Sequence, residues 1–505
     1  MRIFKYYILV VVIAALTACE VEYYDSPNAA AVVPTPGIIN RVQKQLMTDT
    51  RDEWFSGRQA LLWAQYWGQV NYTEEDRFQY RETVNEGGWD DLYMHAEDLK
   101  AIIDLNTDEA TKADMAAYGP NVNQIAAARI MLAYVFHQAV EVWGDIPYYS
   151  YGSDDPEFQA LDLVVGDQKY PAYASQAKIY ADLLKELDEA EAQITGDYVI
   201  DGDNFFNGDA AKWKKFANSL RLRIANRIKG ANATLANQHI ADASGNVMTS
   251  NADNAGVTYT ADNDANTAPM YAAFYISNRL DFAPAHTFVE LLKGERGPFG
   301  WDPRIDAMVA DNDEGFKIGI PVGASRDVVG DFEWESLPGD GILDPKYTEL
   351  FMEYSEVCFL LSENNGWDQT WYEKGVAASM EKWGVDAATI ASYVAGLPAA
   401  SEETVLTQKY IALYMQPYEA WAEYRRTGYP KTLVMPGQSY DVVVPRADGS
   451  TTTFSYEFDP LVDLTDLPNR INYPLVEQNL NGENNAAAAE AIGGDAMDTK
   501  LWWQK

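Results

Sequence analysis

The chain has 505 residues, with 38 Lys and Arg against 76 Asp and Glu, so its formal net charge at pH 7 is -38. A charge of this sign and size argues against nucleic acid and anionic membrane surfaces as partners. The length is ample for a large hydrophobic core.

The N-terminus has the features of an export signal. Two basic residues precede an apolar run from Tyr6 to Leu16. This run is shorter than the about 20 residues needed to span a bilayer, but it suits a secretory signal. The run ends in Leu16-Thr17-Ala18-Cys19, which resembles a bacterial lipobox. We therefore predict a signal peptide over residues 1–18 and a lipid on Cys19; a plain cleaved signal with an accidental cysteine is the alternative.

The predicted acyl chains on Cys19 would anchor the protein without crossing the membrane, and we expect no later segment to be apolar enough to cross. Residues 19–37 contain three prolines and little apolar periodicity, which predicts a tether between the lipid and the fold. With Cys19 lipidated, Cys358 has no disulfide partner. It lies in the apolar run Val357–Leu361, so it is expected to be a small core residue.

Helical periodicity dominates from about Ile38 to Lys229. Apolar residues between Ile125 and Val142 recur at spacings of three and four, and Gly144 followed by Pro147 ends the pattern. A second helix is predicted from about Tyr173 to Ile194. A third follows Asp209, a suitable N-cap residue. Consecutive helices with short links tend to pack as hairpins, as in tetratricopeptide arrays, although no strict 34-residue motif is present.

The second half of the chain begins with a loop-rich region, about residues 231–350, in which Asn, Asp, Gly and Pro are frequent. Helices are predicted again over Tyr354–Glu363, Trp371–Lys382 and Glu402–Arg426. Two β-prone segments around Asp448-Gly449 predict a small β-hairpin. We read residues 38–505 as one mainly α body with a loop-rich region laid over it.

Five segments of the chain, taken together and in this order, are similar to one known family. They are Trp213–Arg223, Glu356–Glu363, Glu419–Pro430, Arg470–Pro474 and Lys500–Trp503. With the lipobox and the helical body, they resemble the SusD/RagB family of outer-membrane lipoproteins, in its SusD-like second branch. The similarity covers nearly the whole chain. It departs from many members at Ser362–Asn364, where those members read Ala-Glu-Ala.

The resemblance implies a tetratricopeptide-type helical hairpin scaffold that binds oligosaccharide or oligopeptide nutrients. It also implies docking as a lid on a SusC-like TonB-dependent transporter. Glu20 and Glu22, directly after the lipid site, together with the resemblance, suggest a lipid-anchored position on the outer face of the outer membrane. The polar motif residues Asn218, Arg221 and Arg223 are expected to be structural, because they lie on a helix whose other face is apolar.

Capture of a sugar needs flat aromatic faces and a few fixed hydrogen-bonding groups. Segments after Trp63 and in the loop-rich region mix these residue types. The candidate ligand residues are Trp67, Asn71, Tyr72, Arg77, Tyr80, Trp301 and Trp334. For Trp63, Tyr66 and Trp67 a buried helical face is an equally physical reading.

Two other functions use the same features. A surface-anchored glycan hydrolase would need paired carboxylates, but among 76 acidic residues a suggestive pair has no specificity. A structural lid subunit would bind the transporter and no nutrient. We expect a binding protein without catalytic residues and without a cofactor; the loops Asp201–Asn204 and Asp311–Gly315 could hold structural Ca²⁺, although neither has EF-hand spacing.

Overall fold

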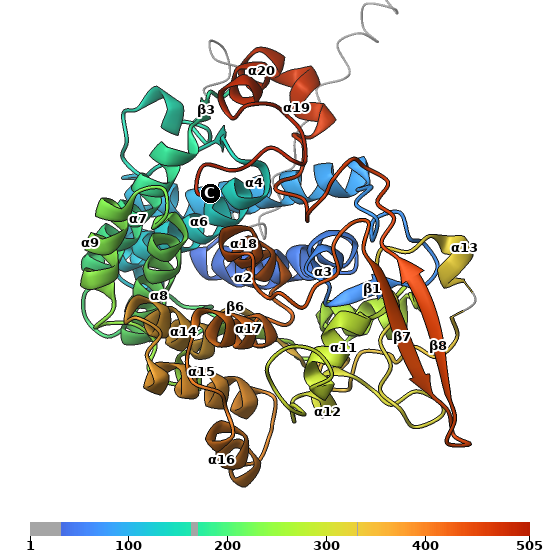
Figure 1. Ribbon diagram of the computed structural model, residues 1–505. Coiled ribbons are helices and arrows are strands. Elements are labelled where there is room, and N and C mark those ends of the chain that lie inside the picture. The colour runs from blue at the N-terminus through green and yellow to red at the C-terminus, as the bar shows by residue number, and fades with distance from the viewer. Residues whose placement is uncertain (1–31, 163–169, 331, 505) are drawn as a thin grey trace, which may run out of the picture. The chain divides into compact units, whose positions relative to one another are not determined.

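The computed structural model describes residues 32–162, 170–330 and 332–504. Within it, Thr35–Lys505 forms one compact unit, coloured from blue to red in Figure 1. The predicted signal peptide and Cys19 lie outside the described residues.

The first half of this unit is a series of helices in which each packs against the next: α2 against α4, α4 against α6, α6 against α7, α7 against α8, and α8 against α9. Their bounds are α2 (Thr35–Thr50), α3 (Leu61–Trp63), α4 (Glu82–Thr107), α5 (Lys112–Met115), α6 (Asn121–Trp143), α7 (Gln176–Gln193), α8 (Ala210–Ile228) and α9 (Ala233–Ala243). Short strands β1 (Trp67–Gln69), β2 (Ile146–Pro147) and β3 (Tyr173–Ala174) join them. This is the helical-hairpin scaffold that the periodicity predicts.

Local chemistry explains where these helices end. Gly144 terminates α6 with φ 95°, a backbone conformation that costs glycine little. Asp209 caps α8, because its carboxylate accepts hydrogen bonds from the amides of Ala211 and Lys212. Both ends fall where the sequence predicts them.

Helix α6 is buried almost from end to end. Among the described residues it is the one helix long and apolar enough to cross a membrane, and its apolar window lies wholly inside the protein. The expectation that no later segment reaches this composition is therefore wrong. A central helix surrounded by other helices is apolar over most of its surface, which gives it the composition of a membrane span.

The loop-rich region carries short elements that periodicity does not show. They are β4 (Ala255–Thr258), α10 (Pro269–Tyr271), β5 (Phe282–Pro284), α11 (His286–Lys293), α12 (Ile305–Met308), α13 (Arg326–Val329) and β6 (Thr348–Met352). β5 pairs antiparallel with β1, and β6 pairs antiparallel with β4. These strands are too short to be recognised from local sequence, because they form only through pairing with partners far away in the chain.

The C-terminal third returns to helices and ends in the hairpin. Its elements are α14 (Tyr354–Asn364), α15 (Gln369–Lys382), α16 (Ala387–Ala395), α17 (Glu402–Ala412), α18 (Pro417–Thr427), β7 (Ser439–Pro445), β8 (Thr451–Glu457), α19 (Leu475–Leu480) and α20 (Gly482–Ala491). The hairpin β7–β8 confirms the prediction around Asp448-Gly449. The single helix predicted over Glu402–Arg426 is wrong, because Pro417 has no amide hydrogen to continue α17 and instead starts α18.

A network of buried ion pairs joins the helices of the core. Arg227 of α8 is fully buried and pairs with Glu141 of α6 and with Glu419 and Glu423 of α18. Arg223, one turn earlier, pairs at 2.5 Å with Glu356 of α14. The structural role predicted for Arg223 is confirmed by these contacts.

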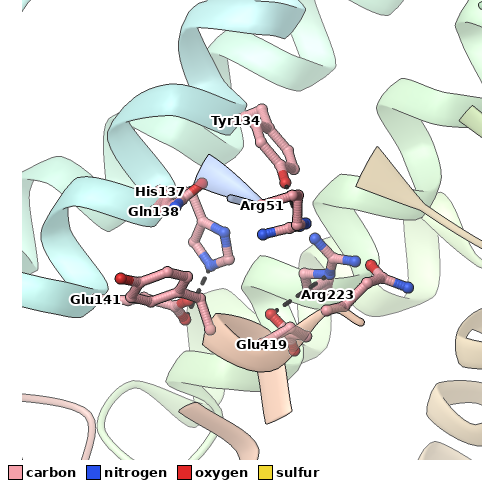
Figure 2. A pocket seen from close by; sticks show the side chains of 9 residues that line it. Arg51, Tyr134, His137, Gln138, Glu141, Arg223 and Glu419 are labelled. Atoms are coloured by element: carbon pink, nitrogen blue, oxygen red, sulfur yellow. Dashed lines mark hydrogen bonds and ion pairs between the residues drawn. The ribbon is translucent and has the colours of Figure 1, made fainter. Parts of the chain in front are cut away.

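Beside this network lies a small polar pocket of about 20 Å³, shown in Figure 2. Arg51, His137 and Gln416 line it together with members of the network, and His137 lies 3.0 Å from Glu141. The volume is close to that needed by a single water molecule. The pocket is therefore part of the core and too small for a nutrient.

The carboxylates of the network respond to their partners in different ways. Burial opposes ionisation of Glu141, but Arg227 and His137 outweigh it and lower the pKa of Glu141 to about 2. At Glu419 burial prevails over Arg227 and Arg223, and its pKa is raised.

We predict that Arg227→Ala lowers the free energy of unfolding by about 3–5 kcal/mol, because it leaves buried carboxylates without their cation. Arg446→Ala is the control, since Arg446 pairs with Glu314 near the surface and such pairs contribute about 0–1 kcal/mol. Urea unfolding of both variants measures the difference. Equal losses of unfolding free energy in the two variants would show that the buried ion pairs of Arg227 stabilise the protein no more than a surface pair does.

Another buried carboxylate lies outside this network and has no cation of the described chain in contact with it. Glu349 in β6 is 1 % exposed, and neither of its oxygens has a hydrogen-bond partner among the described residues. Burial raises its pKa to about 8, against the opposing charges of Arg51 and Lys382. Between the unfolded pKa and about 8 the folded state keeps a proton that the unfolded chain releases, so this group lowers stability as the pH rises.

We predict that Glu349→Gln flattens this pH dependence. Relative to the wild type, the variant should gain stability between about pH 5 and about pH 8, because its side chain releases no proton. Urea unfolding at both pH values checks this, with the exposed Glu333→Gln as control. Parallel pH profiles for the wild type and Glu349→Gln would contradict the assignment.

Candidate functional site

The candidate ligand residues after β1 divide sharply by exposure. Asn71 and Tyr72 are exposed, with 47 % of Tyr72 accessible to solvent. Trp67 is fully buried, and its indole N–H donates a 2.8 Å hydrogen bond to the Tyr414 hydroxyl. Proposing Trp67 as a ligand residue is thus corrected: β1 is covered on both faces by the core, so Trp67 has no face to offer a ligand.

Tyr72 belongs to a patch of exposed side chains brought together by the pairing of β1 with β5. Gln69 pairs with Phe282, and the Val70 amide donates to the Asp281 carbonyl at 2.8 Å. This pairing places the segment before β5 beside Asn71 and Tyr72. We call the patch the aromatic–guanidinium surface; it consists of Trp54, Asn71, Tyr72, Arg81, Tyr275, Ile276, Arg279 and Leu280, with the fully buried Arg58 beneath the rings of Trp54 and Tyr72.

Arginine side chains lie over the rings of this surface. The guanidinium carbon of Arg279 is 4.6 Å from the ring centre of Trp54, and that of Arg58 is 4.9 Å away. Arg58 and Arg81 lie 5.9 Å and 5.7 Å from the ring centre of Tyr72. Cation–π contacts of this kind fix the rings and leave N–H groups at their edges.

Two buried carboxylates hold the guanidinium groups. Glu75, fully buried, pairs with Arg58 at 3.3 Å and with Arg81, and it accepts a 2.8 Å hydrogen bond from the side-chain amide of Gln69. Asp281 pairs with Arg58 at 3.0 Å and with Arg279 at 3.2 Å. The carboxylates of Glu75 and Asp281 therefore neutralise most of the positive charge of the surface.

Both edges of the surface are built on π-helical turns. The turn η1 (Ser56–Ala60) follows Trp54 and contains Arg58, and the turn η6 (Ala272–Ile276) contains Tyr275. Tyr275 is 57 % exposed and contacts Tyr271 at 5.0 Å between ring centres. Such turns insert a residue into a helix and recur at functional sites.

The other predicted residues near this segment have structural partners. Arg77 donates to the Asp459 carbonyl at 2.6 Å and pairs with the Asp459 carboxylate. Tyr80 is half-buried against the core, and burial raises its pKa to about 12. Neither Arg77 nor Tyr80 belongs to the aromatic–guanidinium surface.

Trp334 and Trp301 lie elsewhere. Trp334 is half-buried, 4.9 Å from the ring centre of Phe454 in the β-hairpin, with Arg446 over it at 4.9 Å. Trp301 is 51 % exposed at the edge of a cleft of about 260 Å³. A ligand role for Trp301 and Trp334 stays a prediction.

A third cleft, of about 620 Å³, lies between the β4–β6 pair and the end of α15. Tyr347 and Trp383 form an aromatic wall in it, with ring centres 6.3 Å apart. Neither residue carries a sequence pattern that separates it from an ordinary core position.

In the two loops considered for calcium, acidic side chains are engaged by backbone amides or by a lysine. Both Asp203 oxygens accept hydrogen bonds from backbone amides, including those of Phe205 and Gly208 at 2.9 Å and 3.0 Å. Asp311 lies 3.2 Å from the Lys317 ammonium. In the described part of the chain no cluster of three His, Cys, Asp or Glu could hold a metal ion. Calcium binding there stays an untested expectation.

Cys358 is buried as predicted. Burial raises the pKa of its thiol to about 12, so it is protonated at neutral pH and unsuited to nucleophilic chemistry.

Sequence reasoning missed Trp54, Arg58, Tyr275 and Arg279. Trp54 stands in Asp52-Glu53-Trp54-Phe55, next to a fully buried segment, so nothing in its surroundings distinguishes it from core. The surface forms only when segments more than 200 residues apart pair through β1 and β5.

The fold is thus a helical scaffold that presents this surface to solvent. Residues 27–447 match a family described as starch-binding associating with outer membrane, and residues 399–504 match one described as SusD and RagB outer membrane lipoprotein. The chain therefore belongs to the SusD/RagB family, in its SusD-like second branch. Members of this family are binding proteins rather than enzymes, and membership implies an outer-membrane location.

Solved structures share the fold at low sequence identity. A SusD homolog from Parabacteroides distasonis is 20 % identical with a TM-score of 0.76, covering 93 % of this chain and 98 % of that chain. A chitin-binding protein is 24 % identical with a TM-score of 0.73, covering 93 % and 100 %. A chitin-binding SusD homolog from Flavobacterium johnsoniae is 22 % identical with a TM-score of 0.70, covering 93 % and 98 %. No curated protein sequence matches the chain.

Proposed function

We propose that this chain captures oligosaccharides on the outer face of the outer membrane and passes them to a SusC-like TonB-dependent transporter. The observation that carries the proposal is the aromatic–guanidinium surface, in which exposed Trp54 and Tyr72 lie against guanidinium groups that are held by buried ion pairs. The chitin-binding proteins of the same fold support a glycan over a peptide. The protein then acts by binding, with no catalytic step.

The chemistry of the surface suits an uncharged sugar. A pyranose ring presents an apolar face to an aromatic ring and hydroxyl groups to donors at its edge. Arg81 and Arg279 can donate to those hydroxyls, whereas Arg58 is fully buried and only holds the rings in place. Because Glu75 and Asp281 already pair with these arginines, no strong net positive charge remains to favour an acidic glycan. A nutrient that must be released again is expected to bind with a Kd of about 1 µM to 1 mM.

We predict that Trp54→Ala and Tyr72→Ala each weaken oligosaccharide binding by about 1–3 kcal/mol, because each removes an exposed ring. Calorimetric titration of residues 20–505 with a panel of neutral and acidic oligosaccharides and oligopeptides measures the effect. Tyr170→Ala is the matched control, since Tyr170 is 48 % exposed and lies outside the surface.

Each alternative has its own outcome in this titration. Breakdown of the oligosaccharide would identify a surface-anchored hydrolase. A lack of binding across the panel would favour a structural lid subunit. Full binding by both variants would move the site to another cleft, first to the one lined by Tyr347 and Trp383.

We propose further that a lipid on Cys19 anchors the chain at the cell surface. Glu20 and Glu22 after the lipobox and the family's outer-membrane location support this. Protease added to intact cells should then degrade the wild-type chain, whereas Cys19→Ala should release it from the membrane fraction. A chain fully protected in intact cells would place it on the inner leaflet.

A further inference from the structure

The cleft beside Trp301 is lined by uncharged side chains, although the protein as a whole is strongly acidic. It is formed by two segments, residues 298–301 and residues 392–398. Its side chains are those of Pro298, Phe299, Trp301, Ser392, Tyr393, Leu397 and Pro398. None of these is charged at neutral pH, although the chain as a whole carries a net charge of -38.

The loop that carries Trp301 is fixed by a buried polar cluster. The next residue, Asp302, is fully buried, and its amide donates to the Leu292 carbonyl at 2.7 Å. Arg304, also fully buried, binds both oxygens of Asp302 and donates to Ser379 and Gln408 at 2.8 Å and 2.5 Å. Trp301 therefore extends into solvent from a rigid support.

The same cluster fixes the opposite wall. The Tyr393 hydroxyl donates to the Asp302 carboxylate at 3.1 Å and accepts a 3.1 Å hydrogen bond from the Gln408 amide. Tyr393 belongs to α16, a helix without a fully buried residue. One buried carboxylate thus sets the spacing between the Trp301 loop and the Tyr393 ring before any ligand arrives, which reduces the entropic cost of binding.

This cleft is separate from the aromatic–guanidinium surface. That surface is built on β1 and β5, and α11 follows β5 directly. Eight helical residues extend about 12 Å before the chain reaches the Trp301 loop. No residue lines both places. In Figure 1, α12 and α16 lie in the lower part of the unit, whereas β1 and α13 lie to the right.

We propose that the Trp301–Tyr393 cleft is a second binding site, which takes one short, uncharged saccharide unit. An exposed indole on a rigid loop supplies the stacking face, Ser392 supplies a hydroxyl partner, and the uncharged lining selects against acidic sugars. A volume of about 260 Å³ is below the about 300–1,000 Å³ typical of sites for larger ligands. A proline-rich peptide fits less well, because it needs an extended groove with successive pockets.

This inference shares its ligand class with the proposed function, but it concerns a different place on the chain. Two sites on one chain would hold a glycan at two points and strengthen its retention through effective concentration.

The test is ¹⁹F NMR on the whole mature chain labelled with 5-fluorotryptophan. The resonance missing from Trp301→Phe identifies Trp301, and the one missing from Trp54→Phe reports on the aromatic–guanidinium surface. Chitotriose, cellotriose, maltotriose, a trigalacturonate and a tetraproline peptide are titrated in turn. We expect a neutral trisaccharide to shift the Trp301 resonance saturably, also in the Tyr72→Ala variant, and the trigalacturonate to leave it unchanged.

Substitution of the cleft tests the same point by affinity. Trp301→Ala should weaken binding at the cleft by about tenfold or more while leaving the titration of the Trp54 resonance unchanged. Trp371→Phe is the control, since Trp371 is a partly exposed tryptophan of α15 that does not line the cleft. Unchanged circular dichroism confirms folding of each variant.

The two proposals fail in different ways. If neutral sugars shift the Trp54 resonance and never the Trp301 resonance, the second site is refuted and the proposed function stands. If only tetraproline shifts the Trp301 resonance, the cleft is a peptide site and the saccharide assignment is refuted. If no sugar shifts either resonance, the second site and the assignment of glycan binding to the aromatic–guanidinium surface are both refuted, and the calorimetric titration decides on glycan capture elsewhere on the chain.

Discussion

The structure depends most on one fully buried guanidinium group, that of Arg227. It lies between Glu141 of α6 and the two carboxylates of α18, so helices from the first and last thirds of the chain meet at a single charge. Removing four charges from water is costly, and the arrangement is tolerable only with every partner present. Helix α8, which carries Arg227, therefore has one permitted position between α6 and α18.

Buried polar groups also fix the two surfaces that we assign to ligands, the aromatic–guanidinium surface and the Trp301–Tyr393 cleft. In each, a buried carboxylate positions aromatic rings that reach solvent at least in part: Glu75 acts through Arg58 and Arg81, and Asp302 acts directly on Tyr393. Burial of the ion pair or hydrogen bond makes the support rigid, and the ring itself remains in contact with water. A protein that captures flexible glycans gains from this division, because the ordering cost on its own side is already met during folding.

The family motifs contribute mainly to this internal framework. Arg223 and Glu356 of two different motifs pair with each other, and Arg426 pairs with Glu363 in the same way. Glu363 belongs to the segment Ser362–Asn364, where the sequence departs from many family members, and its carboxylate is retained. The sequence segments that identify the family thus belong to the scaffold, whereas the two surfaces that we assign to ligands lie outside those segments.

The sequence by itself determined the helical scaffold, the ends of helices such as α6 and α8, the β7–β8 hairpin and the burial of Cys358. These features depend on periodicity, capping and turn chemistry, which act over a few residues. The tertiary structure decided which aromatic residues face water. Trp67 is core because β1 pairs with β5 across more than 200 residues, whereas Trp54 is exposed beside Arg279, which precedes β5. Local sequence carries no record of a partner so far along the chain.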